Sequence, residues 1–184
     1  ADRVKNLQKK WSEGKWEGSQ VEVVLTDRSD LSSLSRECDV LCPAATGAIL
    51  NHHTIPTLNT LLVCGAANNQ FEDPQRDGQA LLDRGITYLP DFLVNRMGIV
   101  NCANEQYGYV ENDLTFQRHF DRHWEYSIFQ VAQQVLNRAK VDGIHPHQAA
   151  VVLADEFSRV NHPIWGHRGQ QIIEGLVQSN WANP

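Results

Sequence analysis

The sequence lacks the features by which membrane proteins and nucleic-acid-binding proteins are recognised. No apolar run approaches the roughly 20 residues that a membrane-spanning helix needs, and the first residues do not have the pattern of a signal peptide. No cluster of Lys and Arg is longer than Lys9-Lys10, and the net charge is -6. Electrostatic attraction to nucleic acid therefore has no support. We expect a cytoplasmic protein that binds neither membranes nor nucleic acid.

Paired cysteines and metal-binding patterns are also missing. The cysteines are Cys38, Cys42, Cys64 and Cys102, and none forms a CxxC pair. Most lie in or beside apolar runs, which favours buried, reduced thiols. His119 and His123 are one helical turn apart, a spacing that can bind a metal. The residues between them do not match the HExxH motif, so we expect a solvated helix face and no metal site.

What is present is an alternation of short apolar runs and short helices. Strands are expected at 21–25, 38–42, 61–64 and 86–89, and helices at 1–11, 30–36 and 76–84. In the helix at 30–36, Asp30 is the expected cap, and Leu31 and Leu34 are expected to face inward. This alternation predicts an α/β fold with a doubly wound, mostly parallel sheet, covered by helices on both faces.

Long helices are expected in the last part of the chain. Apolar residues recur every three or four positions from Asp113 to Lys140, which predicts one amphipathic helix ended by Gly143. Pro146 suits the first turn of a second helix, along which Ala149, Leu153, Phe157 and Val160 form a stripe. A last short helix is expected at 170–178. His145-Pro146-His147 then marks a helix entry, and Asn51-His52-His53 a loop.

Two polar runs follow apolar runs where an α/β sheet presents its ligand site. Cys64–Gln70 comes after Leu61–Val63, and Asn95–Gly98 comes after Asp91–Val94. Small residues let a ligand approach the backbone, and carboxamides offer both donors and acceptors. Ligands of open α/β sheets lie outside the carboxyl ends of the strands. A nicotinamide or a small polar substrate is expected here, although no phosphate-binding glycine loop precedes these runs.

Two alternatives stay open for the polar side chains of these runs. Asn68 and Asn69 could form a turn or a helix cap, for which Asn is well suited, but the small residues before them favour contact with a ligand. Asp91 and Glu105 are the nearby carboxylates. A general base needs a geometry that spacing does not supply, so a structural role is favoured for both.

Several motifs in a fixed order resemble the glutamate/leucine/phenylalanine/valine dehydrogenases, in particular the C-terminal half of the leucine dehydrogenase branch. The similarity covers roughly residues 20–160. The motifs are Cys38–Val40, Pro43–Asn51, Thr54–Pro56, Gly65–Gln70, Gly85–Asp91 and Asn101–Tyr109.

The resemblance implies a Rossmann-type cofactor domain and the reversible oxidative deamination of an L-amino acid to a 2-oxo acid and ammonia, with hydride passed to NAD. The adenosine-ribose side of the cofactor is assigned to Ala44 and Ala45. The nicotinamide ribose is assigned to Gly65, Ala66, Ala67 and Asn68. The nicotinamide amide or the amino-acid group is assigned to Asn69 and Asn95. The substrate side-chain pocket is assigned to Met97, Ile99 and Cys102.

The chain also departs from the family pattern. The family's dinucleotide loop and acidic ribose-binding residue are expected before Ala1, and its catalytic lysines and aspartate belong to an N-terminal domain. We therefore expect a partial dinucleotide-binding domain at 1–110 that lacks its first β-α-β unit, and a helical segment at 111–184 that packs on it. No catalytic residue is assigned within the chain, and NADP is not excluded, because the residue that distinguishes it from NAD is expected upstream.

Arg96 and Met97 stand where the leucine branch has small residues. They could shrink the pocket, add a cation or abolish turnover. Two hypotheses follow. In the first, the chain is the cofactor-binding part of a homo-oligomeric amino-acid dehydrogenase whose catalytic N-terminal domain lies elsewhere. In the second, it is a catalytically inactive scaffold or regulatory module derived from that family.

Overall fold

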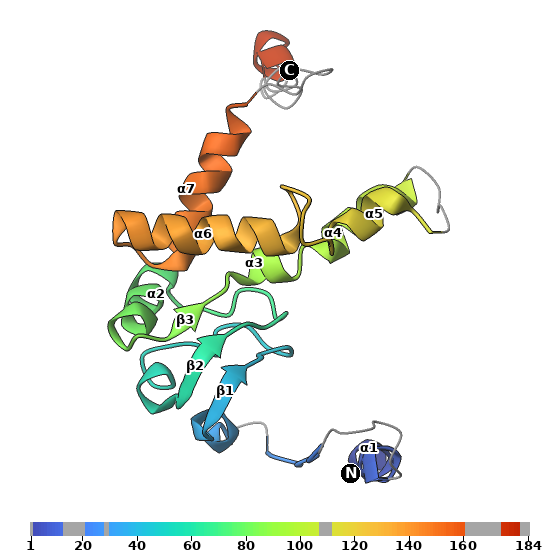
Figure 1. Cartoon of the computed structure of the whole chain (residues 1–184), viewed down its shortest axis with the longest axis vertical. Helices are drawn as coiled ribbons and strands as arrows, with labels where there is room; N and C mark the ends of the chain where they lie inside the picture. The colour runs from blue at the N-terminus through green and yellow to red at the C-terminus, as the bar shows by residue number, and fades with distance from the viewer. Residues whose placement is uncertain (1, 13–20, 28–29, 107–111, 161–173, 181–184) are drawn as a thin grey trace.

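The computed structural model describes residues 2–12, 21–27, 30–106, 112–160 and 174–180 (Figure 1). The elements in chain order are α1 (Asp2–Ser12), η1 (Ser32–Ser35), β1 (Cys38–Leu41), η2 (Ile55–Thr57), β2 (Thr60–Val63), α2 (Pro74–Asp83), β3 (Thr87–Tyr88), α3 (Asp91–Val94), α4 (Met97–Gln106), α5 (Leu114–Arg118), α6 (Ile128–Asp142) and α7 (Pro146–Ser158). The strands thus lie in the first half of the described chain, and helices follow them.

The sheet has three parallel strands in the order β1-β2-β3. Val40 pairs with Leu62 across the first two strands, and Val63 pairs with Tyr88 across the next two. This confirms the predicted parallel α/β sheet. Because parallel strands run in one direction, the segments that leave β1, β2 and β3 emerge at the same edge of the sheet.

Two groups of buried side chains hold these elements together. The first lies between the sheet, η2 and α2 and consists of Leu34, Leu50, Ile55, Leu58, Val63, Phe71, Leu81, Ile86 and Tyr88. The second joins α3 to the pair α6 and α7 and consists of Leu93, Val135, Ala139, Ala149 and Ala150. Figure 1 shows α6 lying across α3, with α7 rising from it.

The ends of the longer helices follow from local sequence. Asp73 accepts hydrogen bonds from the first backbone N–H groups of α2. Gly143, with a φ of 66°, ends α6, and Pro146 opens α7, as the sequence predicts. The cap of α7 is His145, whose ring nitrogen accepts from the Gln148 N–H. A left-handed glycine and an N-terminal proline are the usual signals for these positions.

The single helix predicted from Asp113 to Lys140 is wrong. It is divided into α5 and α6, because Ser127 caps a new helix by accepting from the Gln130 N–H at 3.1 Å. His119 and His123 fall in the intervening segment and do not share a helix face. The stripe predicted on α7 is also incomplete, since Phe157 is exposed.

Several other expectations from the sequence are wrong. Residues 21–25 form no strand, and Leu31 is exposed although Leu34 is buried. Residues 91–94, to which no helix or strand was assigned from the sequence, form the helical turn α3. Cys42 and Cys102 are exposed free thiols. The sheet is not covered on both faces by the described residues, because Leu61 of β2 is 70% exposed.

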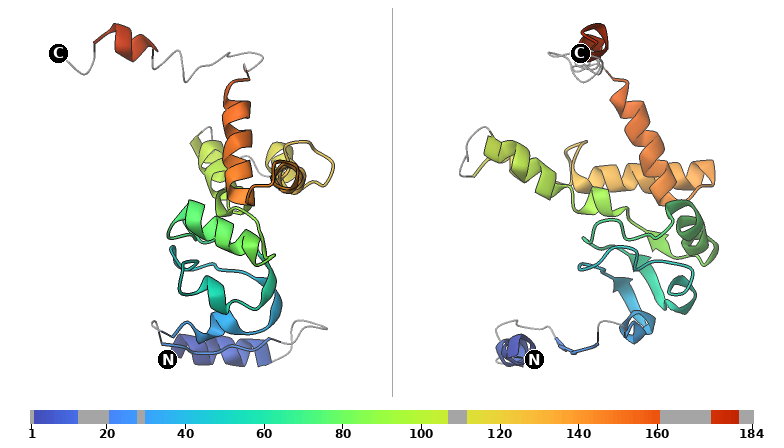
Figure 2. Two further views of the ribbon diagram at one scale, coloured as in Figure 1. Left: turned by 90° about the vertical axis from the view of Figure 1, so that its left-hand side faces the viewer. Right: turned by 180° about the vertical axis from the view of Figure 1, so that it is seen from behind.

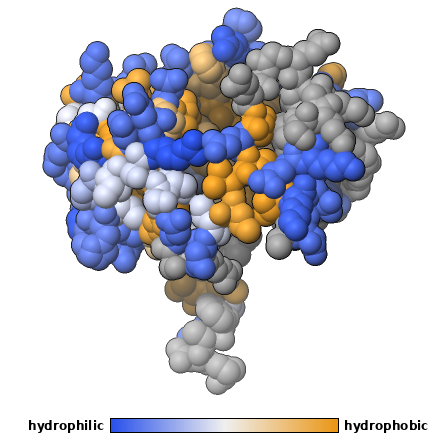
Figure 3. Space-filling model, turned by 90° about the horizontal axis from the view of Figure 1, so that it is seen from below, coloured by the Kyte–Doolittle hydropathy of each residue, from blue (hydrophilic) through white to orange (hydrophobic). Residues whose placement is uncertain are grey.

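Figure 2 shows α1 and the C-terminal turn at opposite ends of the molecule. The turn is helical at 174–178, and the beginning of the helix predicted at 170–178 lies outside the described residues. No helix in the described ranges is both long and apolar enough to cross a membrane. Seen from below, an apolar patch is bordered by hydrophilic side chains (Figure 3).

Candidate functional site

The loops that follow β1 and β2 are joined to each other by backbone hydrogen bonds. These bonds run from Ala67 N to Pro43 O at 3.0 Å, from Ala48 N to Asn69 O at 2.8 Å and from Leu50 N to Gln70 O at 2.9 Å. The side chain of Gln70 is buried and strengthens the second loop, since its Nε2 donates to Gly65 O and Ala67 O. The first polar run is therefore fixed largely by backbone contacts.

Two glycines make this close approach possible. A Cβ atom at Gly65 would lie 2.1 Å from the carbonyl oxygen of Pro43, and one at Gly47 would lie 2.9 Å from the carbonyl oxygens of Asn68 and Asn69. Both distances are far below an ordinary contact. From the sequence, Gly65 was expected to let a ligand approach the backbone. In the structure, its lack of a side chain lets the loop after β1 approach.

The two polar runs meet through a pair of carboxamides. Asn95 Nδ2 donates to Asn68 Oδ1 at 2.6 Å and to Ala66 O at 3.3 Å. In the described part of the chain, the side-chain NH2 group of Asn68 and the side-chain oxygen of Asn95 have no hydrogen-bond partner. The pair therefore offers a donor and an acceptor next to each other at the carboxyl edge of the sheet.

Asp91 anchors the turn that carries this pair. Its carboxylate is only 6% exposed; Oδ2 accepts from the Asn69 N–H at 2.7 Å and Oδ1 accepts from the Tyr88 hydroxyl at 3.1 Å. Burial, helped by the charge of Asp91, raises the pKa of Tyr88, so the hydroxyl keeps its proton. Asn69 has a φ of 53°, in the left-handed region that Asn tolerates better than most residues.

The other residues assigned to the cofactor differ in solvent exposure. Ala44, Ala45 and Ala66 are exposed on the two loops, whereas Gly65 and Ala67 are buried beneath them. The exposed alanines are therefore open to a ligand, and the buried residues shape the loop from within.

The residues assigned to the substrate pocket all lie on α4, directly after Asn95. Met97 is half-buried, Cys102 is exposed and Ile99 is 77% exposed. They lie on a helix that begins at the site, and the side chains of Ile99 and Cys102 lie on its open surface.

Arg96 points away from the carboxamide pair. Its guanidinium donates to the backbone oxygen of Tyr126 and lies 3.2 Å from Nδ1 of His119. Partial burial lowers its pKa, and burial together with Arg96 lowers the pKa of His119. The sequence position of Arg96 indicated effects on the pocket, and no local signal indicated a contact 30 residues away.

A hollow of about 430 Å³ opens beside the Asn68–Asn69 turn. Its wall includes Asp91, Phe92 and His147, a residue that the sequence placed only at a helix entry. His147 packs edge-on against Phe92, with ring centres 5.3 Å apart. Burial lowers its pKa, and the neighbouring Asp91 acts in the opposite direction.

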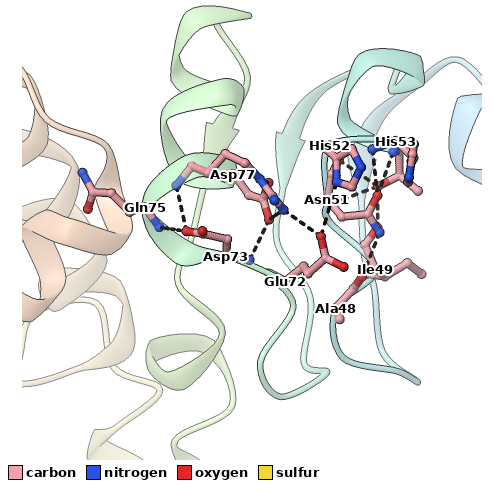
Figure 4. Close-up of polar contacts among 11 residues, drawn as sticks. Ala48, Ile49, Asn51, His52, His53, Glu72, Asp73, Gln75 and Asp77 are labelled. Carbon is pink, nitrogen blue, oxygen red and sulfur yellow. Dashed lines mark hydrogen bonds and ion pairs between the residues drawn. The ribbon is translucent and has the colours of Figure 1, made fainter.

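A separate polar network holds the loop after β1 against the start of α2 (Figure 4). Arg76 pairs with the buried carboxylate of Asp77 at 2.7 Å and with Glu72 at 2.8 Å. Glu72 also lies 3.4 Å from Nδ1 of His52. Within the described ranges, no group of three or more His, Cys, Asp or Glu side chains is arranged to hold a metal ion. The network joins the loop after β1 to the first turn of α2.

A family model described as Glutamate/Leucine/Phenylalanine/Valine dehydrogenase matches residues 2–163. The chain belongs to this family. It is 38% identical over 128 residues to an L-tryptophan dehydrogenase of Nostoc punctiforme, covering 70% of this chain and 34% of that protein. A leucine dehydrogenase of Bacillus cereus is 38% identical over 120 residues, covering 65% and 31%. The chain spans about a third of the length of these dehydrogenases.

Solved structures agree with the family assignment. The crystal structure of the Nostoc punctiforme L-tryptophan dehydrogenase superimposes with a TM-score of 0.59 at 36% identity, over 67% of this chain and 34% of that chain. A hetero-hexameric glutamate dehydrogenase from Thermus thermophilus, in its Leu-bound form, gives a TM-score of 0.57 at 19% identity, over 83% and 35%. The second similarity extends to the fold alone.

Proposed function

We propose that this chain forms the cofactor-binding part of an NAD-dependent L-amino-acid dehydrogenase, which reversibly converts an amino acid to a 2-oxo acid and ammonia. Family membership supports the reaction class. The observation that carries the assignment of the site is the Asn68–Asn95 pair, because it joins the loops after β2 and β3 at the edge where α/β sheets bind ligands.

The pair fits the primary carboxamide of a nicotinamide. Such a group needs one acceptor for its N–H and one donor for its oxygen. Asn95 supplies the acceptor and Asn68 the donor, and their mutual hydrogen bond fixes both. When bound, NAD would accept hydride from the substrate carbon. The exposed Ala44, Ala45 and Ala66 would let the cofactor lie close to the loops.

We assign the substrate side chain to α4 and the catalytic groups to residues outside this chain. Met97, Ile99 and Cys102 on α4 would face the amino-acid side chain. The base and the groups that bind the substrate carboxylate would come from outside this chain, which spans about a third of its relatives. Residues 1–110 would form a partial dinucleotide-binding domain, with 111–184 packed on it, in a cytoplasmic homo-oligomer. NADP is a second possible cofactor.

The test uses the enzyme that contains this chain, assayed for NADH formation with a panel of aliphatic, aromatic and acidic L-amino acids. We expect activity with at least one of them. Asn95→Ala should raise the KM for NAD about ten-fold, because the loss of the hydrogen bonds of Asn95 to Asn68 and to the nicotinamide amide would cost about 1.4 kcal/mol of binding free energy. Asn101→Ala is the matched control, because the hydrogen bond that the structure gives its side chain runs to Glu105, one turn further along α4, and not to the carboxamide pair. No NADH with any amino acid, together with no binding of NAD, would favour the scaffold hypothesis instead.

A further inference from the structure

Asp91 is the most buried carboxylate that borders the candidate site, and both of its oxygens are in use. Oδ2 accepts from the Asn69 N–H and Oδ1 from the Tyr88 hydroxyl, which itself is buried. A carboxylate that acts as a general base needs an oxygen within reach of the substrate proton. Asp91 instead directs its oxygens at the chain's own donors.

The contact with Asn69 determines the shape of the polar run. Asn69 adopts a φ of 53°, which costs energy for a residue with a side chain unless the surroundings hold it. Asp91 binds its N–H from one side, and Ala48 N binds its carbonyl oxygen from the other. The left-handed turn is thus held between the loop after β3 and the loop after β1.

The left-handed turn at Asn69 also fixes the position of Asn68. The Asn68 side chain precedes the held residue and receives the 2.6 Å hydrogen bond from Asn95. Asp91 and Asn95 lie on the same short element, since Asn95 N donates to Asp91 O at 2.8 Å across α3. One end of α3 therefore holds the backbone of the turn, and the other end holds its side chain.

We propose that Asp91 is a positioning residue that fixes the Asn68–Asn69 turn and thereby aligns the Asn68–Asn95 carboxamide pair for the cofactor. The part that concerns the cofactor rests on the function proposed above. The alignment of the turn does not, because it follows from hydrogen bonds within the chain. A negative charge suits this place, since hydrogen bonds to a charged acceptor are stronger than neutral ones.

The first experiment measures amide hydrogen exchange at Asn69 in the intact protein without cofactor. Asp91→Ala should speed this exchange about ten-fold or more, because the acceptor is lost. Asp91→Asn should restore most of the protection, because its amide oxygen can accept from Asn69 while its NH2 group donates to the Tyr88 hydroxyl. Asp83→Ala is the control, since Asp83 is exposed and, among the described residues, its side chain accepts from Gln79 on its own helix. Unchanged exchange in Asp91→Ala would overturn the proposal.

The second experiment measures steady-state kinetics of the same variants. We expect Asp91→Ala to raise the KM for NAD about ten-fold with a smaller change in kcat, and Asp91→Asn to recover near-normal values with an unchanged pH profile. A general base would behave differently: Asp91→Asn would be as inactive as Asp91→Ala, at unchanged KM, and that result would overturn the positioning role. If the unaltered protein oxidises no amino acid, the proposed function fails, and the exchange experiment still decides whether Asp91 fixes the turn.

Discussion

The loops at the carboxyl edge of the sheet and the described residues that follow them, 97–106 and 112–127, are held in place by different means. The loops are joined by backbone hydrogen bonds, and the glycines at positions 47 and 65 allow their contact. The following segment has exposed apolar side chains, such as Ile99 and Phe120, and Arg96 ties its far end to the start of α4. The contact between the loops requires that Gly47 and Gly65 have no side chain. The contact in the second region requires the side chain of Arg96.

The same substitution should have opposite effects in the two regions. Gly65→Ala places a Cβ 2.1 Å from the carbonyl oxygen of Pro43. This oxygen belongs to the backbone and, unlike the end of a side chain, cannot rotate away. We expect a loss of about 3 kcal/mol or more in the free energy of unfolding, at the upper end of overpacking effects. Denaturant unfolding followed by circular dichroism measures it.

Gly98→Ala is the matched change in the second region. No atom of the described residues lies within 4 Å of a Cβ placed at this position of α4. Replacing a helical glycine by alanine should stabilise the protein by up to about 1 kcal/mol. Equal effects of the two substitutions would contradict the comparison.

Removing the guanidinium of Arg96 should loosen the second region alone. In Arg96→Ala, the backbone oxygen of Tyr126 and the His119 ring lose their donor. We expect faster amide exchange within 119–127, corresponding to about 1–2 kcal/mol, while the amides of Ala48 and Ala67 keep their protection. Arg96→Lys is the control for charge, since an ammonium lacks the planar fork of the guanidinium. Equal loosening of both regions would show that Arg96 does not act locally.

Acid should weaken the junction of α2 and α7, which packs against the first region. His145 is 1% exposed, and a Cβ at Gly78 of α2 would lie 2.5 Å from its Nδ1. Burial, and then the neighbouring His147, lower the pKa of His145. The folded state thus favours the neutral ring, which alone can accept the helix-capping hydrogen bond.

A lowered pKa in the folded state means that the free energy of unfolding is at its full value above about pH 6.5, the ordinary pKa of histidine. It should then decline as the pH falls through the folded-state pKa, which lies lower. His145→Asn keeps a capping side chain without a titratable group, so part of this decline should disappear. His123→Asn, at an exposed position, should leave the decline intact. Thermal unfolding between pH 8 and pH 5 compares them.

Much of the fold could be predicted because its signals are local. Gly143 and Pro146 mark helix ends by their own backbone preferences, and the apolar runs before Pro43 and Gly65 form β1 and β2. The prediction failed where a competing local signal was overlooked. Ser127 caps α6 within a continuous apolar periodicity, and α3 begins directly after Pro90, where no helix was predicted.

The candidate site could be predicted in composition but not in arrangement. The carboxamides and small residues were visible in the sequence. That Asn68 and Asn95 bond each other, that Asp91 is committed to Asn69, and that Arg96 turns toward Tyr126 depend on contacts between residues 22 to 30 positions apart. Such contacts follow from the sheet register, which composition and spacing leave open.

The hydrogen bonds between the loops after β1 and β2 continue on both sides of Leu50, whose N–H donates to Gln70 and whose oxygen accepts from Glu72. Leu50 and Phe71 thus form a parallel bridge outside the named strands. One residue inserted into either loop would move every later pair out of register. A loop of different length, transplanted from a related protein without its partner loop, would therefore break the backbone bonds that follow the change in length. The lengths of the two loops are therefore coupled, and a change in one requires a matching change in the other.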